Sequence, residues 1–227
     1  MIPWVHLDTA RIPDGGEIRL KQRGQEFSIM LGDNELMNSR LSGSEEALAT
    51  LACAKLTNPA PHILIGGLGM GFTLRAALAV LGPQAQVTVA ELVPGVIGWA
   101  RGPMATIFGT SLNDSRVRLI EADVGALIRN RQMPFDAILL DVDNGPEGLS
   151  RAGNDALYDH SGLVAARAAL CPGGVLAVWS QGPEAGFAAR CRKAGFVVED
   201  HRVRAHGQGR SKGRGGARHV VWLGVRG

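Results

Sequence analysis

Five short apolar runs alternate with segments of helical periodicity between residues 62 and 194. Strands that are apolar on both faces, with helices between them, are typical of a parallel sheet covered on both sides. The apolar runs span residues 62–66, 86–91, 117–123, 135–143 and 174–180, and the helical segments span residues 71–82, 93–101, 123–131, 155–171 and 183–194. The pattern predicts a Rossmann-like, doubly wound α/β domain.

The two ends of the chain follow another pattern. The runs "GFVVEDHRVR" and "ARHVVWLGV" have no helix between them, which predicts an antiparallel pair that completes a seven-stranded, mostly parallel sheet. Near the N-terminus, apolar residues two apart on either side of Gly24 predict a β-hairpin, and Ser42 and Glu45 have capping-box spacing before a helix. We therefore expect an N-terminal β-hairpin element over 1–43 and a Rossmann-like domain over 44–227.

Composition limits the environment and the cofactors. Hydrophobic residues make up 45% of the 227 residues, which is enough for a sizeable core. The chain shows no signal-peptide pattern and no apolar run long enough to span a membrane. The three cysteines are odd in number and far apart, and neither a CxxC nor an HxxxH motif occurs. We therefore expect a cytoplasmic protein with reduced thiols, no membrane partner and no metal.

The positive charge is concentrated near the C-terminus. The formal net charge is +3, yet seven basic and no acidic residues follow Asp200, so the rest of the chain is mildly acidic. Several of the basic residues lie in a Gly/Arg-rich loop at 205–217, which could grip a phosphate backbone. The loop lacks the aromatic residues of a base-stacking platform, so we favour a solvated hairpin loop and keep nucleic acid as the alternative.

Three glycines at alternate positions, Gly67, Gly69 and Gly71, lie between the first parallel strand and its helix. Ligands of doubly wound sheets bind at this edge, where glycine allows a close backbone approach, although a tight turn without a ligand would also need glycine. A dinucleotide loop would place its third glycine at Phe72, and a P-loop would need a lysine. The spacing therefore favours a nucleoside without phosphates, whose amino-acid-like tail passes over the loop.

Carboxylates follow the next three strands. Glu91 could accept hydrogen bonds from ribose hydroxyls, unless it is only an exposed strand-end residue. Asp123 could contact an adenine amino group, cap the next helix, or do both. Asp141 and Asp143 could bind a cationic amine and accept its proton, although the following Asn-Gly-Pro is also strong turn chemistry. Tyr158 and Trp179 could form a wall of the acceptor pocket, but such residues are more often core.

An ordered set of motifs resembles the class I S-adenosylmethionine-dependent transferases, and more narrowly the spermidine/spermine synthase-like group. The set covers nearly the whole chain and comprises "ILIGGLGMG", Glu91, "EADV", "ILLDVDNGPEGL" and "ALCPGGVLAVWS". The resemblance implies that Asp141 and Asp143 are catalytic, and that the nucleoside is bound by Gly67, Gly69, Met70, Gly71, Glu91, Leu92, Asp123, Val124 and Asp141. It also implies S-adenosylmethionine or its decarboxylated form as cofactor and a small amine or cationic acceptor, and it leaves a homodimer open.

Three positions depart from that group's pattern. Met70 replaces the aspartate that helps to hold the amine-terminated tail of decarboxylated S-adenosylmethionine, Ser44-Glu45 replaces a Tyr-His pair, and Asn38 replaces a glutamine. Because Met70 removes an acid that would repel the carboxylate of S-adenosylmethionine, we predict methyl transfer to a small amine or cationic acceptor. The alternatives are aminopropyl transfer from the decarboxylated form to a diamine, a non-catalytic nucleoside-binding protein, and a nucleic-acid methyltransferase.

Overall fold

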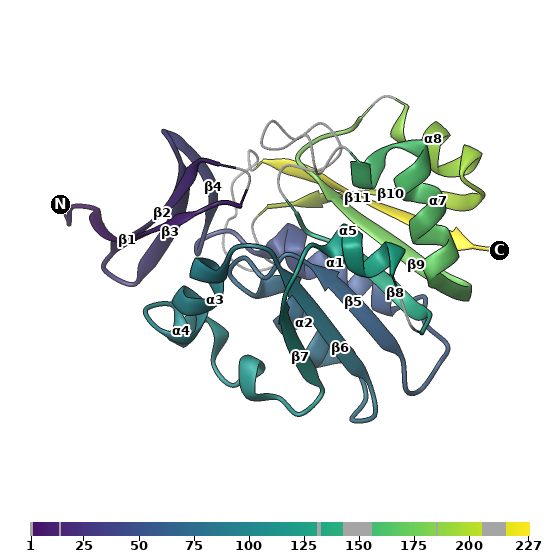
Figure 1. Cartoon of the computed structure of the whole chain (residues 1–227), viewed down its shortest axis with the longest axis horizontal. Coiled ribbons are helices and arrows are strands. Elements are labelled where there is room, and N and C mark those ends of the chain that lie inside the picture. The colour runs from purple at the N-terminus through teal and green to yellow at the C-terminus, as the bar shows by residue number, and fades with distance from the viewer. Residues whose placement is uncertain (1, 14, 131–132, 143–155, 185, 206–216) are drawn as a thin grey trace.

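A seven-stranded sheet forms the centre of the molecule (Figure 1). The structure is a computed structural model that describes all residues except 1, 14, 131–132, 143–155, 185 and 206–216. The strand order is β10-β11-β9-β8-β5-β6-β7. The strands are β5 (His62–Gly66), β6 (Gln86–Glu91), β7 (Val117–Glu121), β8 (Phe135–Leu140), β9 (Leu170–Ser180), β10 (Phe196–Arg204) and β11 (Arg218–Arg226).

The strand directions agree with the predicted sheet. Strands β5 to β9 pair in parallel, whereas β11 is antiparallel to both of its neighbours, β9 and β10. The prediction of a mostly parallel seven-stranded sheet that ends in an antiparallel pair is therefore confirmed. Parallel strands place their carboxyl ends at one edge, so the loops after β5, β6, β7 and β8 meet there.

Helices cover both faces of this sheet, as alternate residues of β5 show. Ile63 and Ile65 pack in one hydrophobic core with helices α1, α2 and α3, whereas Leu64 packs in a second core with α5, α7 and α8. The helices are α1 (Gly43–Cys53), α2 (Phe72–Val80), α3 (Pro94–Arg101), α4 (Ala105–Phe108), α5 (Val124–Arg129), α7 (His160–Ala169) and α8 (Phe187–Lys193), with a 3-10 helix at Ser111–Asn113. The sequence did not predict α4 or the 3-10 helix, because both are too short to show a period.

The N-terminal residues form a separate four-stranded antiparallel sheet beside α3 (Figure 1). Its strands, in order across the sheet, are β1 (Val5–Arg11), β2 (Glu17–Arg23), β3 (Glu26–Leu31) and β4 (Asn34–Asn38). The predicted hairpin is the β2–β3 pair, which turns at Gly24 with φ 59°. The indole Nε1 of Trp99 in α3 donates a hydrogen bond of 2.7 Å to Asp8 Oδ2 in β1, so this sheet is attached to the main domain.

The predicted capping box before α1 is wrong. The helix does begin after Ser42, but the Ser42 side chain makes no capping hydrogen bond. The Glu45 carboxylate instead accepts a hydrogen bond of 2.7 Å from the hydroxyl of Ser44, and the residue lines a cavity. The spacing of Ser42 and Glu45 is that of a capping box, but the Glu45 side chain points to Ser44 and a cavity instead of the helix N-terminus.

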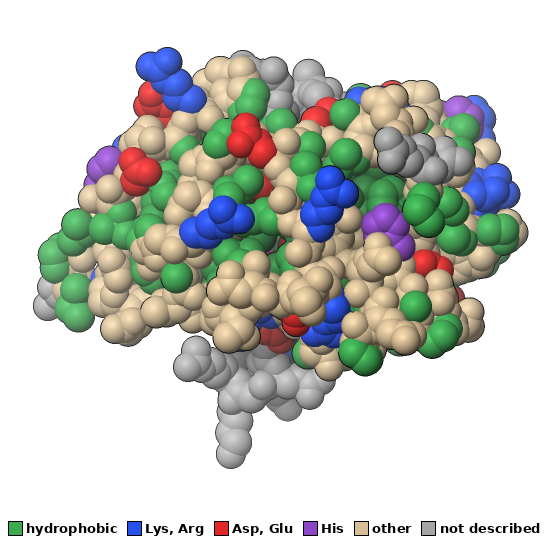
Figure 2. Space-filling view, turned by 60° about the horizontal axis from the view of Figure 1, so that its bottom comes forward, with side chains coloured by type: hydrophobic (Ala, Val, Ile, Leu, Met, Phe, Trp, Pro, Cys, Tyr) green, Lys and Arg blue, Asp and Glu red, His purple; other side chains and the backbone are tan. Residues whose placement is uncertain are grey.

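The remaining expectations concern membrane spans, the cysteines and the basic loop. None of the helices in the described ranges is long and apolar enough to cross a membrane. The three cysteines are free thiols. On the face shown in Figure 2, Lys and Arg side chains stand apart among polar and apolar surface. Residues 206–216 of the basic loop lie outside the described residues, so the solvated-loop interpretation stays a prediction.

Candidate active site

The glycine loop between β5 and α2 has left-handed backbone at all three predicted positions, with φ 87° at Gly67, 50° at Gly69 and 75° at Gly71. A Cβ at Gly67 would lie 2.4 Å from the carbonyl oxygen of Asp141, and a Cβ at Gly71 would lie 2.3 Å from Phe108 Cε1. Both glycines are therefore required by the packing of the loop itself. Gly69 differs because it lines two adjoining cavities.

The first cavity lies at the carboxyl edge of the sheet, under the N-terminal sheet. Strands β2, β3 and β4 provide an apolar cover that includes Ile18, Leu31 and Leu36. On the opposite side, the cavity is lined by most of the residues predicted to bind the nucleoside: Gly67, Gly69, Glu91, Leu92, Asp123, Val124 and Asp141. An apolar cavity with carboxylates at one side suits a nucleoside, whose base is flat and whose ribose carries hydroxyls.

Glu91 is fixed at the floor of this cavity. Its side chain is buried, and its oxygens Oε2 and Oε1 accept hydrogen bonds of 2.9 Å from the backbone N–H groups of Leu68 and Val93. Burial raises the pKa of this carboxyl group, and the backbone donors oppose that rise. The alternative of an exposed strand-end carboxylate is therefore wrong. Each oxygen has a second lone pair that could accept a ribose hydroxyl.

Asp123 is the N-cap of α5, with Oδ1 accepting a hydrogen bond of 2.7 Å from the backbone N–H of Gly125. It also lies 3.7 Å from the guanidinium of Arg129 and lines the first cavity. The capping role is thus present in the structure. The adenine contact stays a prediction, which the cavity lining permits.

Asp141 lies where the first cavity meets the second. It follows β8, and its Oδ2 accepts a hydrogen bond of 2.6 Å from the hydroxyl of Thr73 at the start of α2. Burial raises the pKa of Asp141 to about 6. It lines both cavities, so a group bound in either one can reach it. Asp143, the other predicted catalytic residue, lies outside the described residues.

The second cavity contains residues that sequence reasoning did not assign to a site. Glu45 lines it together with Met70, Gly71, Trp179 and His219. Burial and the nearby charge of Asp141 raise the pKa of Glu45 to about 7. The sequence marked Glu45 only by its capping-box spacing from Ser42 and by the replacement of a Tyr-His pair, and neither pattern assigns it to a cavity. Trp179 does line this cavity, whereas Tyr158 is buried against Phe187 in the core.

A chain of hydrogen bonds connects Glu45 in α1 to His219 in strand β11. The Ser44 hydroxyl donates to Glu45 Oε2, and His219 Nδ1 on β11 lies 2.8 Å from the same hydroxyl oxygen. When the Ser44 hydroxyl donates its single proton to the ionised Glu45 carboxylate, the Nδ1–H tautomer of His219 completes the chain by donating to Ser44. Burial lowers the pKa of His219, so the ring is held neutral. The Glu45 carboxylate is therefore oriented without a countercharge.

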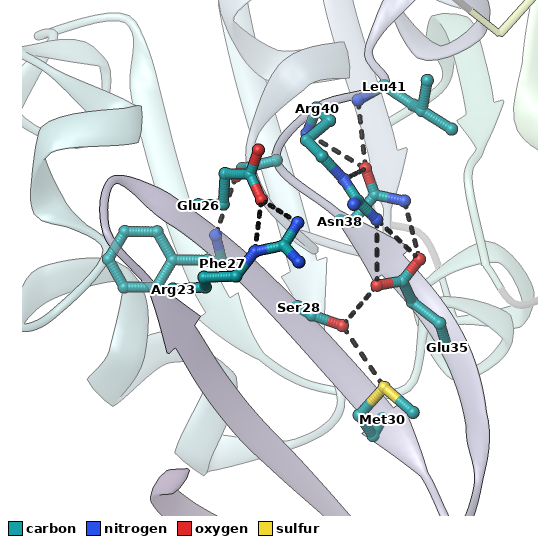
Figure 3. Close-up of polar contacts among 10 residues, drawn as sticks. Arg23, Glu26, Phe27, Ser28, Met30, Glu35, Asn38, Arg40 and Leu41 are labelled. Carbon is teal, nitrogen blue, oxygen red and sulfur yellow. Dashed lines mark hydrogen bonds and ion pairs between the residues drawn. The ribbon is translucent and has the colours of Figure 1, made fainter. Parts of the chain in front are cut away.

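Glu35 also lines the second cavity, but its charge is already compensated (Figure 3). The Glu35 carboxylate accepts hydrogen bonds from Ser28 and Asn38 and forms an ion pair of 3.2 Å with Arg40. By contrast, no Lys or Arg lies among the described residues that line this cavity. Two carboxyl groups, Glu45 and Asp141, thus face it without an ion-pair partner in the described chain. Such a cavity favours a cationic ligand.

The fold defines the class of protein: a Rossmann-like α/β domain of the class I methyltransferase type, with a largely apolar cavity at the carboxyl edge of its sheet. No family model matches the chain. The spermidine synthase of Thermotoga maritima superposes with a TM-score of 0.73 over 98% of this chain and 72% of that one, at 18% sequence identity. This likeness shows the fold alone.

Sequence relatives narrow the class. The chain is 32% identical over 130 residues to polyamine aminopropyltransferase 1 of Streptomyces coelicolor, covering 56% of this chain and 24% of the relative. It is 29% identical over 197 residues to a polyamine aminopropyltransferase of Mycobacterium tuberculosis, covering 82% of this chain and 36% of the relative. The chain therefore spans less than half the length of these relatives. The comparisons confirm the resemblance to the spermidine synthase-like group of class I transferases.

Proposed function

We propose that the chain is a transferase that moves the aminopropyl group of decarboxylated S-adenosylmethionine to a small amine. The observation that carries the proposal is the position of Asp141, which lines both the nucleoside cavity and the acidic second cavity. A donor in the first cavity and a cationic amine in the second would meet at this carboxylate. The names of the sequence relatives support aminopropyl transfer over the methyl transfer that we predicted from the sequence.

Met70 is the residue by which the sequence favours methyl transfer. Its side chain is buried, with only 3% of its surface exposed, and it leaves the glycine loop without an acid. The second cavity nevertheless contains Glu45 and Asp141, so the carboxylate of S-adenosylmethionine would still meet negative charge there. The absence of an acid at position 70 therefore does not favour methyl transfer as strongly as the sequence suggested.

The chemistry needs only alignment and one base. An ammonium acceptor gives one proton to the Asp141 carboxylate, and the freed nitrogen lone pair attacks the carbon beside the donor's sulfonium. The C–N bond forms as the C–S bond breaks, and the bonding electrons stay on sulfur as a neutral thioether. Burial raises the pKa of Asp141 to about 6, which lets it accept and later release a proton near neutral pH. The hydroxyl of Thr73 orients this carboxylate.

The first prediction tests this role by changing Asp141 to Asn. We expect kcat to fall about 100-fold or more, because a general base contributes at least that factor. The measurement follows the release of methylthioadenosine from the decarboxylated donor in the presence of a panel of diamines. Glu46→Gln, which removes an exposed carboxylate in α1 that lines neither cavity, is the control.

Two outcomes would contradict the proposal. Wild-type turnover by Asp141→Asn would remove the proposed base. Tight nucleoside binding without turnover of any donor would instead favour the non-catalytic alternative. The cytoplasmic location, the homodimer and the role of the basic loop stay predictions.

A further inference from the structure

Glu45 lies beyond the point where the two cavities join. The cavities share Leu36, Met37, Gly69 and Asp141, and Glu45 lines only the second. A nucleoside in the first cavity can extend its tail into the second only across this junction. The rim of the second cavity beyond Gly69 continues along the glycine loop through Met70 to Phe72. A tail that follows this rim ends beside the start of α2, where Glu45 lies.

Contacts with helix α2 and, through Ser44, with strand β11 fix Glu45 at that place. The hydroxyl of Thr73, in the first turn of α2, lies 2.6 Å from Asp141 Oδ2 and 3.4 Å from the backbone carbonyl oxygen of Glu45. The Ser44 hydroxyl holds the Glu45 carboxylate from the other side, and His219 holds Ser44. The carboxylate is thus preorganised, and no described cation is available to neutralise it.

We propose that Glu45 binds the ammonium end of the donor's aminopropyl tail and thereby selects the decarboxylated donor over S-adenosylmethionine. This inference rests on the proposed function. The two donors differ only at that end, which carries an ammonium group in one and both an ammonium and a carboxylate in the other. A carboxylate placed in this cavity would face Glu45 and Asp141 with no described Lys or Arg to balance it. Glu45 would then provide from α1 the acid that Met70 does not provide from the glycine loop.

Isothermal titration calorimetry at pH 8 with three ligands tests the inference. The ligands are the decarboxylated donor, S-adenosylmethionine, and methylthioadenosine, which has the nucleoside but no charged tail. The variants are Glu45→Gln, which keeps the size of the side chain, and Glu46→Gln, which removes an exposed carboxylate one residue away. Methylthioadenosine reports in each variant whether the fold and the first cavity are intact.

We expect the wild type and Glu46→Gln to bind the decarboxylated donor at least about tenfold more tightly than S-adenosylmethionine, as a charge-assisted hydrogen bond implies. In Glu45→Gln, we expect the affinity for the decarboxylated donor to fall about tenfold and that for S-adenosylmethionine to hold or rise. Binding of methylthioadenosine should stay unchanged.

Failure of the inference about Glu45 can be distinguished from failure of the proposed function. If Glu45→Gln keeps the wild-type ratio between the two donors while methylthioadenosine binds normally, the inference is wrong and the proposed function stands. The inference is also wrong if the change raises only the KM for the amine, because Glu45 would then bind the acceptor. If the wild type binds none of the three nucleosides, the proposed function and the inference both fail.

Discussion

Two carboxyl groups in the second cavity, Glu45 and Asp141, carry an electrostatic cost in the folded protein. Their pKa values are raised to about 7 and about 6, mainly by burial. A carboxyl group whose pKa is higher in the folded state contributes its stability below the unfolded-state pKa, and that contribution is lost as the pH rises through the folded value. The window of loss therefore runs from roughly pH 4 to pH 7.

The second prediction follows for Glu45→Gln. The neutral amide removes the ionisation that opposes folding, so the variant should melt a few degrees above the wild type at pH 8 and show a smaller difference at pH 5. Asp141 and Glu46 lie near enough for their charges to raise the pKa of Glu45, so Glu45→Gln also relieves these two carboxylates, in the same direction at pH 8. His219 is held to Glu45 only through Ser44 and is the same residue in both proteins. Calorimetric melting curves at the two pH values measure the effect. If the difference in melting temperature between variant and wild type does not change with pH, ionisation of Glu45 does not destabilise the folded protein.

Among single residues, the sequence identified as site residues those at the ends of parallel strands. It missed the site residues that come from other elements. Glu91 ends its strand, and Gly67 and Asp141 directly follow theirs. These strands are adjacent and parallel, so strand order alone brings the three residues to one edge. Glu45 and His219 reach the same site from a helix and from the last strand. Ser44 and His219 share a hydrogen bond although they lie 175 residues apart. No local pattern encodes such a contact.

Strand β4 and the start of α1 together position the second cavity. Asn38 ends β4, and its Oδ1 accepts hydrogen bonds of 3.0 and 3.2 Å from the backbone N–H groups of Arg40 and Leu41 (Figure 3). Its amide group also donates to Glu35. Asn38 therefore holds the connection that leads into α1, and through it the place of Glu45. We had interpreted Asn38 only as a departure from a family pattern.

The third prediction is that Asn38→Ala lowers the free energy of unfolding by about 1 to 3 kcal/mol, because partly buried backbone donors lose their acceptor. We also expect weaker binding of the decarboxylated donor, since the start of α1 shifts. Urea unfolding and calorimetry provide the two measurements. Glu26→Gln is the matched control on the same sheet, where it breaks a partly exposed ion pair with Arg23 and should lower the free energy of unfolding by less than Asn38→Ala does. Equal costs for the two variants would contradict this role of Asn38.

Sequence patterns predicted elements well where burial is periodic. Strands β5, β6 and β8 and most of β9 are buried and apolar, so their positions were clear, whereas β7 is only half-buried. In β2 and β3 the apolar side chains lie two residues apart. Strand β1 is almost entirely exposed and β4 is mostly polar, so neither carries the alternation that marks a half-buried strand. The N-terminal element was therefore expected as a hairpin and is a four-stranded sheet.

The whole molecule combines two sheets that line different sides of the first cavity. The large sheet provides the glycine loop and the strand-end carboxylates, whereas the small sheet covers the first cavity with apolar side chains. The fold class followed from the order of strands and helices, because few topologies satisfy that order. The type of reaction did not follow from that order, because it depends on charged side chains that several elements bring together. The choice between methyl and aminopropyl transfer is a property of the assembled cavity.

The central claim is best tested by offering the wild-type protein both donors together with a mixture of diamines, and identifying the products by mass spectrometry. Our account predicts methylthioadenosine and a diamine that is heavier by one aminopropyl group, with the decarboxylated donor consumed. Formation of S-adenosylhomocysteine and a methylated amine, with the decarboxylated donor left intact, would contradict it.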